Sequence, residues 1–94
     1  MSKESEKYEI IMLTQDGCGH CANAKNILKE KIDSGKIIVM DVIKDNQALD
    51  LANKYNVRGV PAIILKDKVT QLTESCELSL DGSKIVCKDK EVKL

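Results

Sequence analysis

The chain has 94 residues, which is enough for one domain with a single hydrophobic core. Its 15 Lys and Arg residues balance its 15 Asp and Glu residues, so it lacks the basic excess that binds nucleic acid or an anionic membrane. A hydrophobic content of 43% is typical of a globular chain, and no apolar run approaches the roughly 18 residues of a transmembrane helix. The composition therefore predicts one soluble domain over residues 1–94, without a nucleic-acid or membrane partner.

Residues 1–7 are polar and charged and are predicted to form an N-terminal tail. They contain no apolar stretch resembling a secretory signal, which predicts a cytoplasmic location. Disulfides in the cytosol are usually transient and catalytic, so four cysteines in this chain point to redox chemistry or to metal binding. The cysteines are Cys18, Cys21, Cys76 and Cys87.

The first half of the sequence predicts a βαβ unit. Residues 8–13 include four consecutive apolar residues, as in a strand buried on both faces. A helical pattern then runs from Cys18 to about Ile32, and Gly35 suits the left-handed residue that ends a helix. Residues 37–42 form a second β-rich run, and this order predicts two parallel strands. The apolar stripe of the helix is expected to contain Cys21, Ala24, Ile27, Leu28 and Ile32.

The second half predicts another helix and three strands. Asp45 can cap a helix over about residues 46–56, and Pro61 opens an apolar strand. Residues 69–90 predict a C-terminal β-hairpin with Asp81-Gly82 as its two-residue turn. The element order is therefore β-α-β-α-β-β-β, in an α/β fold with a mixed sheet.

Cys18-Gly19-His20-Cys21 lies where the first strand gives way to the first helix. At a helix N-terminus the sulfur of Cys18 faces unpaired backbone N–H groups, which stabilise a thiolate. Cys21 follows one turn later on the buried side, within reach of that sulfur. The spacing predicts that Cys18 attacks a substrate disulfide and that Cys21 resolves the mixed disulfide. We expect His20, unless it is an ordinary exposed histidine, to favour the thiolate and Asp16 to oppose it.

These residues resemble the thioredoxin superfamily. The chain resembles the family in the order and spacing of its elements over about residues 8–73, with the Cys18–Cys21 motif at this junction and Gly59-Val60-Pro61 before the third strand. The four residues of the motif are those found in protein disulfide isomerase domains. The resemblance implies a thiol–disulfide oxidoreductase with no cofactor. It also implies a cis Val60–Pro61 peptide facing the two cysteines, where the Val60 backbone pairs with an extended substrate. The expected partners are protein disulfides or dithiols and a reductase, and the expected state is a monomer.

The sequence departs from this family in several places. Gly17 stands where thioredoxins have Trp, so an aromatic wall of the substrate groove is missing. Met12 lies near the position of the acidic residue that relatives bury beneath the resolving cysteine. The residue before Pro61 is not the threonine with which glutaredoxins bind glutathione, which favours protein dithiols as partners. A β-hairpin stands in place of the usual C-terminal helix.

Cys76 and Cys87 are predicted to lie directly opposite each other. If residues 81–82 form a two-residue turn, Leu80 faces Ser83, and counting outward pairs Cys76 with Cys87 at a Cα separation of about 4.5 to 5.5 Å. A structural disulfide, a pair of buried thiols and a second redox-active pair all fit this placement. The apolar face of the hairpin is expected to carry Cys76, Leu78, Leu80, Ile85 and Cys87.

A different interpretation joins all four cysteines around one zinc ion. The chain would then be a zinc-stabilised binding module without redox activity. The position of the Cys18–Cys21 motif inside a βαβ unit favours the oxidoreductase, because zinc sites usually repeat a close-spaced pair, whereas ten residues separate Cys76 from Cys87.

Overall fold

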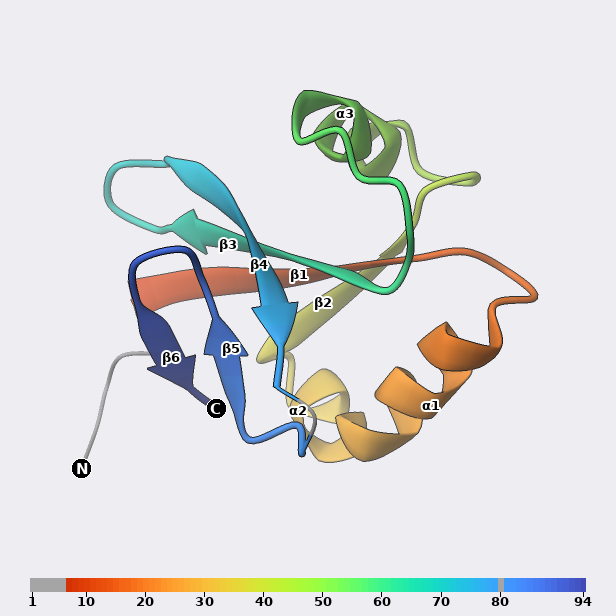
Figure 1. Ribbon diagram of the computed structural model, residues 1–94, viewed down its shortest axis with the longest axis horizontal. Helices are drawn as coiled ribbons and strands as arrows, with labels where there is room; N and C mark the ends of the chain where they lie inside the picture. Colours follow the sequence, from red (N-terminus) through yellow and green to blue (C-terminus); the bar gives the residue numbers. More distant parts are fainter. Residues whose placement is uncertain (1–6, 80) are drawn as a thin grey trace.

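The computed structural model describes residues 7–79 and 81–94. Within this part of the chain, six strands form one mixed sheet in the order β2-β1-β3-β4-β5-β6 (Figure 1). The α/β class and the mixed sheet are as the sequence predicts. The elements are β1 (Tyr8–Thr14), α1 (Gly19–Ile27), α2 (Lys29–Asp33), β2 (Ile37–Asp41), α3 (Asn46–Lys54), β3 (Ala62–Asp67), β4 (Thr73–Leu78), β5 (Lys84–Val86) and β6 (Glu91–Lys93).

Strand β1 is the centre of the fold. It pairs in parallel with β2 and antiparallel with β3, so the predicted βαβ unit is confirmed. Successive side chains of a strand point to opposite faces. Ile10 and Met12 therefore pack in one hydrophobic cluster with Leu28, whereas Ile11 and Leu13 pack in a second cluster. Helices α1 and α2 cover the first face, and α3 covers the second (Figure 1).

The predicted first helix is divided into α1 and α2 at Leu28, whose φ of −100° and ψ of 15° are not helical. Leu28 is buried, but Ile27 beside it is 48% exposed, so the expectation that Ile27 lies on the buried stripe is wrong. The predicted stop is confirmed, because Gly35 has a φ of +83°. The N–H of Gly35 donates to the carbonyl of Ile32, and the next N–H reaches back to Lys31. These bonds satisfy carbonyls at the end of α2.

Helix α3 begins as predicted. The side chain of Asp45 accepts hydrogen bonds from the backbone N–H groups of Gln47 at 2.9 Å and Ala48 at 3.4 Å. Ala48 is completely buried in the second cluster. The cap and the apolar face together fix α3 against the sheet.

The C-terminal hairpin has the predicted register but a longer turn. The strand expected from Val69 begins only at Thr73. The last backbone pairing before the turn joins Ser79 to Lys84, so four residues connect the strands where two were predicted. The hydrogen bond from the Gly82 N–H to the Ser79 carbonyl closes this turn at 3.0 Å.

Pairing across the hairpin nevertheless follows the expected count, because Glu77 lies opposite Val86 and Leu78 opposite Ile85. The hydrogen bond between Ser79 and Lys84 belongs to the same register, so the predicted pairing is kept. Cys76, Ile85 and Cys87 are buried on the apolar face, as predicted. The expected place of Leu80 on that face lies outside the described residues.

Strand β6 was not predicted. It pairs antiparallel with β5, with Val92 opposite Ile85, and both side chains are buried in the cluster that also contains Leu28. Strands β5 and β6 thus cover the same side of the sheet as α1 and α2 (Figure 1). In the described residues, no helix has the length and apolar character needed to cross a membrane.

Candidate active site

The turn before α1 sets the position of Cys18. Its backbone N–H donates to the carbonyl of Gln15 at 3.2 Å, and Gly17 between them has a φ of +82°. Residues with a Cβ rarely adopt this conformation. The positive φ therefore explains why residue 17 is glycine, although the family resemblance leads one to expect Trp at this position.

Cys18 is the N-cap of α1. Its backbone is extended, and its sulfur accepts a hydrogen bond from the Cys21 N–H at 3.1 Å. The pKa of Cys18 is lowered, first by a hydrogen bond with the Cys21 side chain. The backbone N–H groups of Cys21 and His20 and the charge of Lys25 lower it further. Each of these groups favours the thiolate over the thiol, as predicted for a sulfur at a helix N-terminus.

Cys21 is placed in the opposite environment. Only 1% of its surface is exposed, whereas Cys18 is half-buried. Burial is the largest cause that raises the pKa of Cys21, and the hydrogen bond with Cys18 raises it further. The pair therefore contains one accessible sulfur that favours the anion and one shielded sulfur that favours the thiol.

The loop before β3 lies against Cys18. In the thiol form, the side chain of Cys18 donates to the carbonyl of Val60 at 3.6 Å. The peptide bond between Val60 and Pro61 is cis. The fold thus brings together residues that are more than 40 positions apart in the sequence.

The residues expected to modulate Cys18 occupy different surroundings. His20 is exposed, and it is its backbone N–H that helps to lower the pKa of Cys18. Asp16 forms an ion pair with Lys44, so its negative charge has a local counter-charge and its predicted opposition to the thiolate is weakened. A Cβ at Gly19 would meet no atom within 4 Å, so the space around this position does not require glycine.

Lys25 was not identified from the sequence as a residue that lowers the pKa of Cys18. It lies in α1 one turn beyond Cys21, and this spacing could have identified it, because residues four apart on a helix share a face. Met12 is completely buried in the cluster of Ile10 and Leu28, and so brings no carboxylate to this core. No acidic group is among the causes that shift the pKa of Cys21.

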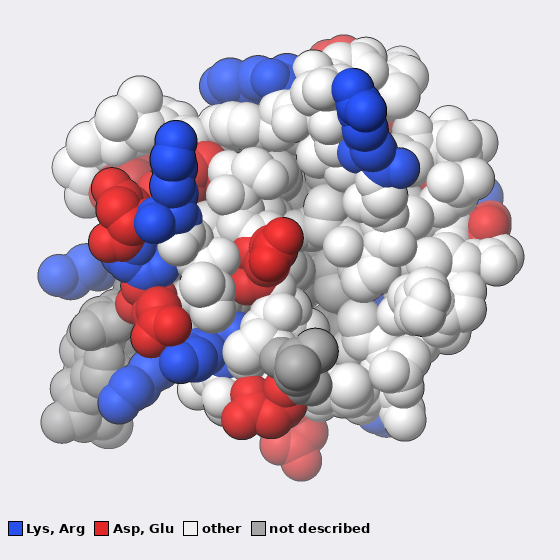
Figure 2. Space-filling model, viewed as in Figure 1, with Lys and Arg blue, Asp and Glu red and all other residues white. Residues whose placement is uncertain are grey.

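A groove of about 530 Å³ lies next to the cysteine motif, between α1, the loop before β3 and strand β4. Figure 2 shows that the charged side chains on this side of the molecule gather mainly over β4, β5 and β6, whereas most of the surface over α1 is uncharged. The residues lining the groove include His20, Asn23, Arg58, Pro61, Ser75 and Glu77. A hollow beside the cysteine motif that combines apolar and polar lining residues suits a peptide segment.

Cys76 and Cys87 form a disulfide with a Cα separation of 4.4 Å. Cys18 and Cys21 are free thiols. In the described residues, which include all four cysteines, the one cluster of three possible metal ligands joins Cys76 and Cys87 to Glu74. The four sulfurs do not converge, so the alternative of a four-cysteine zinc site is wrong.

The mixed sheet, the helices on both faces and the cysteine pair at the start of α1 define an α/β domain of the thioredoxin type. A sequence model of the thioredoxin domain matches residues 8–72, and the chain belongs to this family. Proteins of this family are generally oxidoreductases. Neither a curated protein nor a solved structure matches the chain. The matched region contains both cysteines of the motif and ends just before β4.

Proposed function

We propose that the chain is a thiol–disulfide oxidoreductase that exchanges a Cys18/Cys21 dithiol with protein disulfides. The observation that carries this proposal is the unequal environment of the two sulfurs. Cys18 accepts a hydrogen bond from a helix N-terminus and is accessible, whereas Cys21 is 1% exposed. Thiol–disulfide exchange needs an accessible thiolate to attack and a second thiol held nearby to resolve the intermediate.

The proposed reaction has two steps. The Cys18 thiolate attacks one sulfur of a substrate disulfide, and the other substrate sulfur leaves as a thiolate. Cys21 then attacks the Cys18 sulfur of the mixed disulfide, which releases the second substrate sulfur. Two electrons pass to the substrate, and the Cys18–Cys21 disulfide forms. The reverse sequence oxidises a substrate dithiol.

Cys21 must lose a proton before it attacks. Burial raises the pKa of its thiol, and none of the described residues brings a buried carboxylate that could receive the proton. The departing substrate thiolate and solvent are the acceptors in this proposal. Resolution by Cys21 is therefore the step expected to slow at low pH.

The substrate is proposed to lie along the loop before β3 as an extended segment. The carbonyl of Val60 is within 3.6 Å of the Cys18 sulfur, so a strand pairing with the Val60 backbone would bring its own sulfur to Cys18. Arg58 and Glu77 line the groove beside this path and are placed to contact flanking residues. An unidentified reductase completes the cycle. The cytoplasmic location, the monomeric state and the absence of nucleic-acid and membrane partners remain predictions from the sequence.

The experiment compares Cys18→Ser and Cys21→Ser in an insulin-reduction assay driven by a chemical dithiol. We expect Cys18→Ser to lose catalysis and Cys21→Ser to accumulate mixed disulfides with substrate, detectable by non-reducing electrophoresis and mass spectrometry. The matched control is Ser34→Ala, which changes an exposed serine at the end of α2, outside the groove, without removing a sulfur. Retention of full activity by Cys18→Ser would show that the assignment is wrong.

A further inference from the structure

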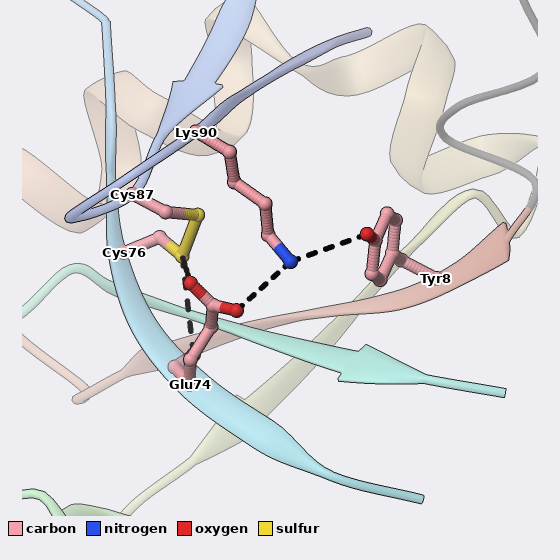
Figure 3. The surroundings of a disulfide bond; sticks show 5 residues. All are labelled: Tyr8, Glu74, Cys76, Cys87 and Lys90. Carbon is pink, nitrogen blue, oxygen red and sulfur yellow. Dashed lines mark hydrogen bonds and ion pairs between the residues drawn. A yellow bond between two sulfur atoms is a disulfide. The ribbon is translucent and has the colours of Figure 1, made fainter. Parts of the chain in front are cut away.

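The disulfide between Cys76 and Cys87 has polar neighbours that a structural cross-link does not need (Figure 3). The Oε1 atom of Glu74 lies 3.8 Å from the sulfur of Cys76, and the Glu74 carbonyl oxygen lies 4.0 Å from it. A disulfide sulfur carries no hydrogen, so it cannot donate to either oxygen. A thiol at Cys76 would find both acceptors in place.

The carboxylate of Glu74 is held in this orientation by Lys90. The Lys90 ammonium is 3.0 Å from Oε2 of Glu74, and it also donates to the hydroxyl of Tyr8 at 3.2 Å (Figure 3). The same ammonium lies 4.7 Å from the centre of the Tyr8 ring. Hydrogen bonds with Glu74 and then with Tyr8 raise the pKa of Lys90. The other oxygen of Glu74 is thus left pointing toward the sulfur.

The backbone holds the two cysteines opposite each other without help from the bond. Glu77 and Val86 form the neighbouring pair of the β4–β5 ladder, and the Cys87 N–H donates to the Lys90 carbonyl at 2.8 Å. Opposed residues in antiparallel strands have Cα atoms about 4.5 to 5.5 Å apart. The same backbone can therefore carry two separate thiols, and reduction does not require the strands to part.

Cys76 and Cys87 are also among the residues that line a hollow of about 290 Å³ between β4 and β5. Cys87 is 8% exposed and Cys76 is 6% exposed, whereas Ile85, two residues before Cys87 on the same face, is 0% exposed. A small dithiol would reach the bond through this residual exposure of the two cysteines. The hollow is lined by Ser75, Cys76, Glu77, Val86, Cys87 and Lys88.

We propose that Cys76 and Cys87 form a second redox couple, which dithiols reduce while the domain stays folded. The thiolate of a dithiol attacks the Cys87 sulfur, the Cys76–Cys87 bond breaks, and the second thiol of the reductant then displaces Cys87. Two electrons pass to the protein and the dithiol becomes a disulfide. Its two protons end on Cys76 and Cys87, where the Cys76 thiol donates to Glu74. Glu74 is a positioning residue that stabilises the reduced state.

The test uses a Cys18→Ser/Cys21→Ser chain, so that only the second couple can exchange and the result does not depend on the proposed function. This chain is equilibrated at pH 7 in buffers with defined ratios of reduced and oxidised dithiothreitol. Alkylation and mass spectrometry give the reduced fraction, and far-UV circular dichroism reports whether the domain is folded. Glu74→Gln removes the charged acceptor, and Glu30→Gln is the control, because Glu30 is exposed on α2 and does not line the hollow beside the two cysteines.

We expect reversible reduction with an unchanged circular dichroism spectrum. A hydrogen bond to a charged acceptor exceeds one to a neutral acceptor by about 1 kcal/mol, so Glu74→Gln should lower the reduction equilibrium constant about fivefold. Glu30→Gln should leave the constant unchanged. Reduction that occurs only with unfolding would overturn the proposal. So would a Glu74→Gln variant whose constant equals that of Glu30→Gln or exceeds that of the parent chain.

Discussion

Replacing Gly82 by alanine tests how closely the hairpin turn is seated against the helix that carries Cys18. Gly82 is buried and has a φ of +73°. A Cβ at this position would lie 2.5 Å from Cγ2 of Ile27 in α1. Real Cβ atoms do not approach another carbon so closely, so the turn, α1 or the side chain of Ile27 has to move.

Two costs add at this position. A left-handed backbone costs a residue with a Cβ about 1 to 2 kcal/mol relative to glycine. Overpacking adds roughly 1 to 3 kcal/mol. The free energy of unfolding should therefore fall by about 2 to 5 kcal/mol in Gly82→Ala, which is a large part of the stability of a domain of this size.

Gly35→Ala is the matched control. Gly35 has a φ of +83°, but a Cβ there would meet no atom within 4 Å. The free energy of unfolding of this variant should fall only by the cost of the left-handed backbone, about 1 to 2 kcal/mol. The difference between the two variants isolates the contact between the turn and Ile27.

Urea unfolding followed by far-UV circular dichroism measures both variants, since the chain has no Trp for fluorescence. The midpoint should shift while the slope with denaturant stays constant. If Gly82→Ala and Gly35→Ala lose the same stability, the turn does not rest against α1 as described. If neither loses stability, the left-handed conformation itself is refuted.

Three further predictions concern the cysteines and one carboxylate. Reducing the Cys76–Cys87 bond, which joins residues 11 apart, should lower the free energy of unfolding by up to about 3 kcal/mol, because the cross-link restricts the unfolded chain; urea titration with and without a phosphine reductant measures this. Lys25→Gln should move the alkylation profile of Cys18 with iodoacetamide to higher pH, because the lysine charge lowers the pKa of that thiol. Hydrogen bonds from two serine side chains hold the pKa of Asp81 at about 2, below its ordinary 3.8. The stability from these bonds should therefore be complete above about pH 4 and disappear as the pH falls toward 2, so that Asp81→Asn and the parent chain converge there in acid unfolding.

Each of these predictions has a contrary outcome. Equal urea midpoints with and without reductant would mean that the cross-link does not constrain the unfolded chain. Lys29→Gln is the control for Lys25, since Lys29 instead pairs with Asp33, and equal profiles for the two variants would remove Lys25 from the site. A stability difference between Asp81→Asn and the parent chain that persists below pH 2 would contradict the low pKa of this carboxyl.

Local patterns in the sequence were sufficient for much of the fold. Four consecutive apolar residues in 8–13 predicted a strand buried on both faces, and β1 is such a strand. Gly35 predicted the end of a helix and has the required positive φ. The pairing count along the hairpin predicted that Cys76 and Cys87 lie opposite each other. This prediction is confirmed even though the turn is longer than expected. These features depend on residues close in the chain, where backbone sterics and side-chain period dominate.

Local sequence patterns could not predict the contacts that surround Cys18, because these contacts join residues far apart in the chain. Asp16 pairs with Lys44, which is 28 positions away, and the Val60 carbonyl faces Cys18 across 42 positions. Strand β6 has only Val92 as a buried residue, so its pattern is too weak to show a strand until β5 pairs with it. The predicted role of the His20 side chain likewise depended on where a long side chain points, which spacing does not determine.

The sequence alone determined the position of Cys18 at the N-terminus of α1, because a CxxC spacing at a strand-to-helix junction places its first sulfur there. It also determined that Cys76 and Cys87 face each other, since strand pairing is set by a local count. Only the tertiary structure decided that these two sulfurs are bonded and that Glu74 and Lys90 surround them. Only the tertiary structure decided that β5 and β6 complete the core over α1 and α2. Contacts of this kind join residues far apart in the chain, and their geometry is set by the packing of the whole domain.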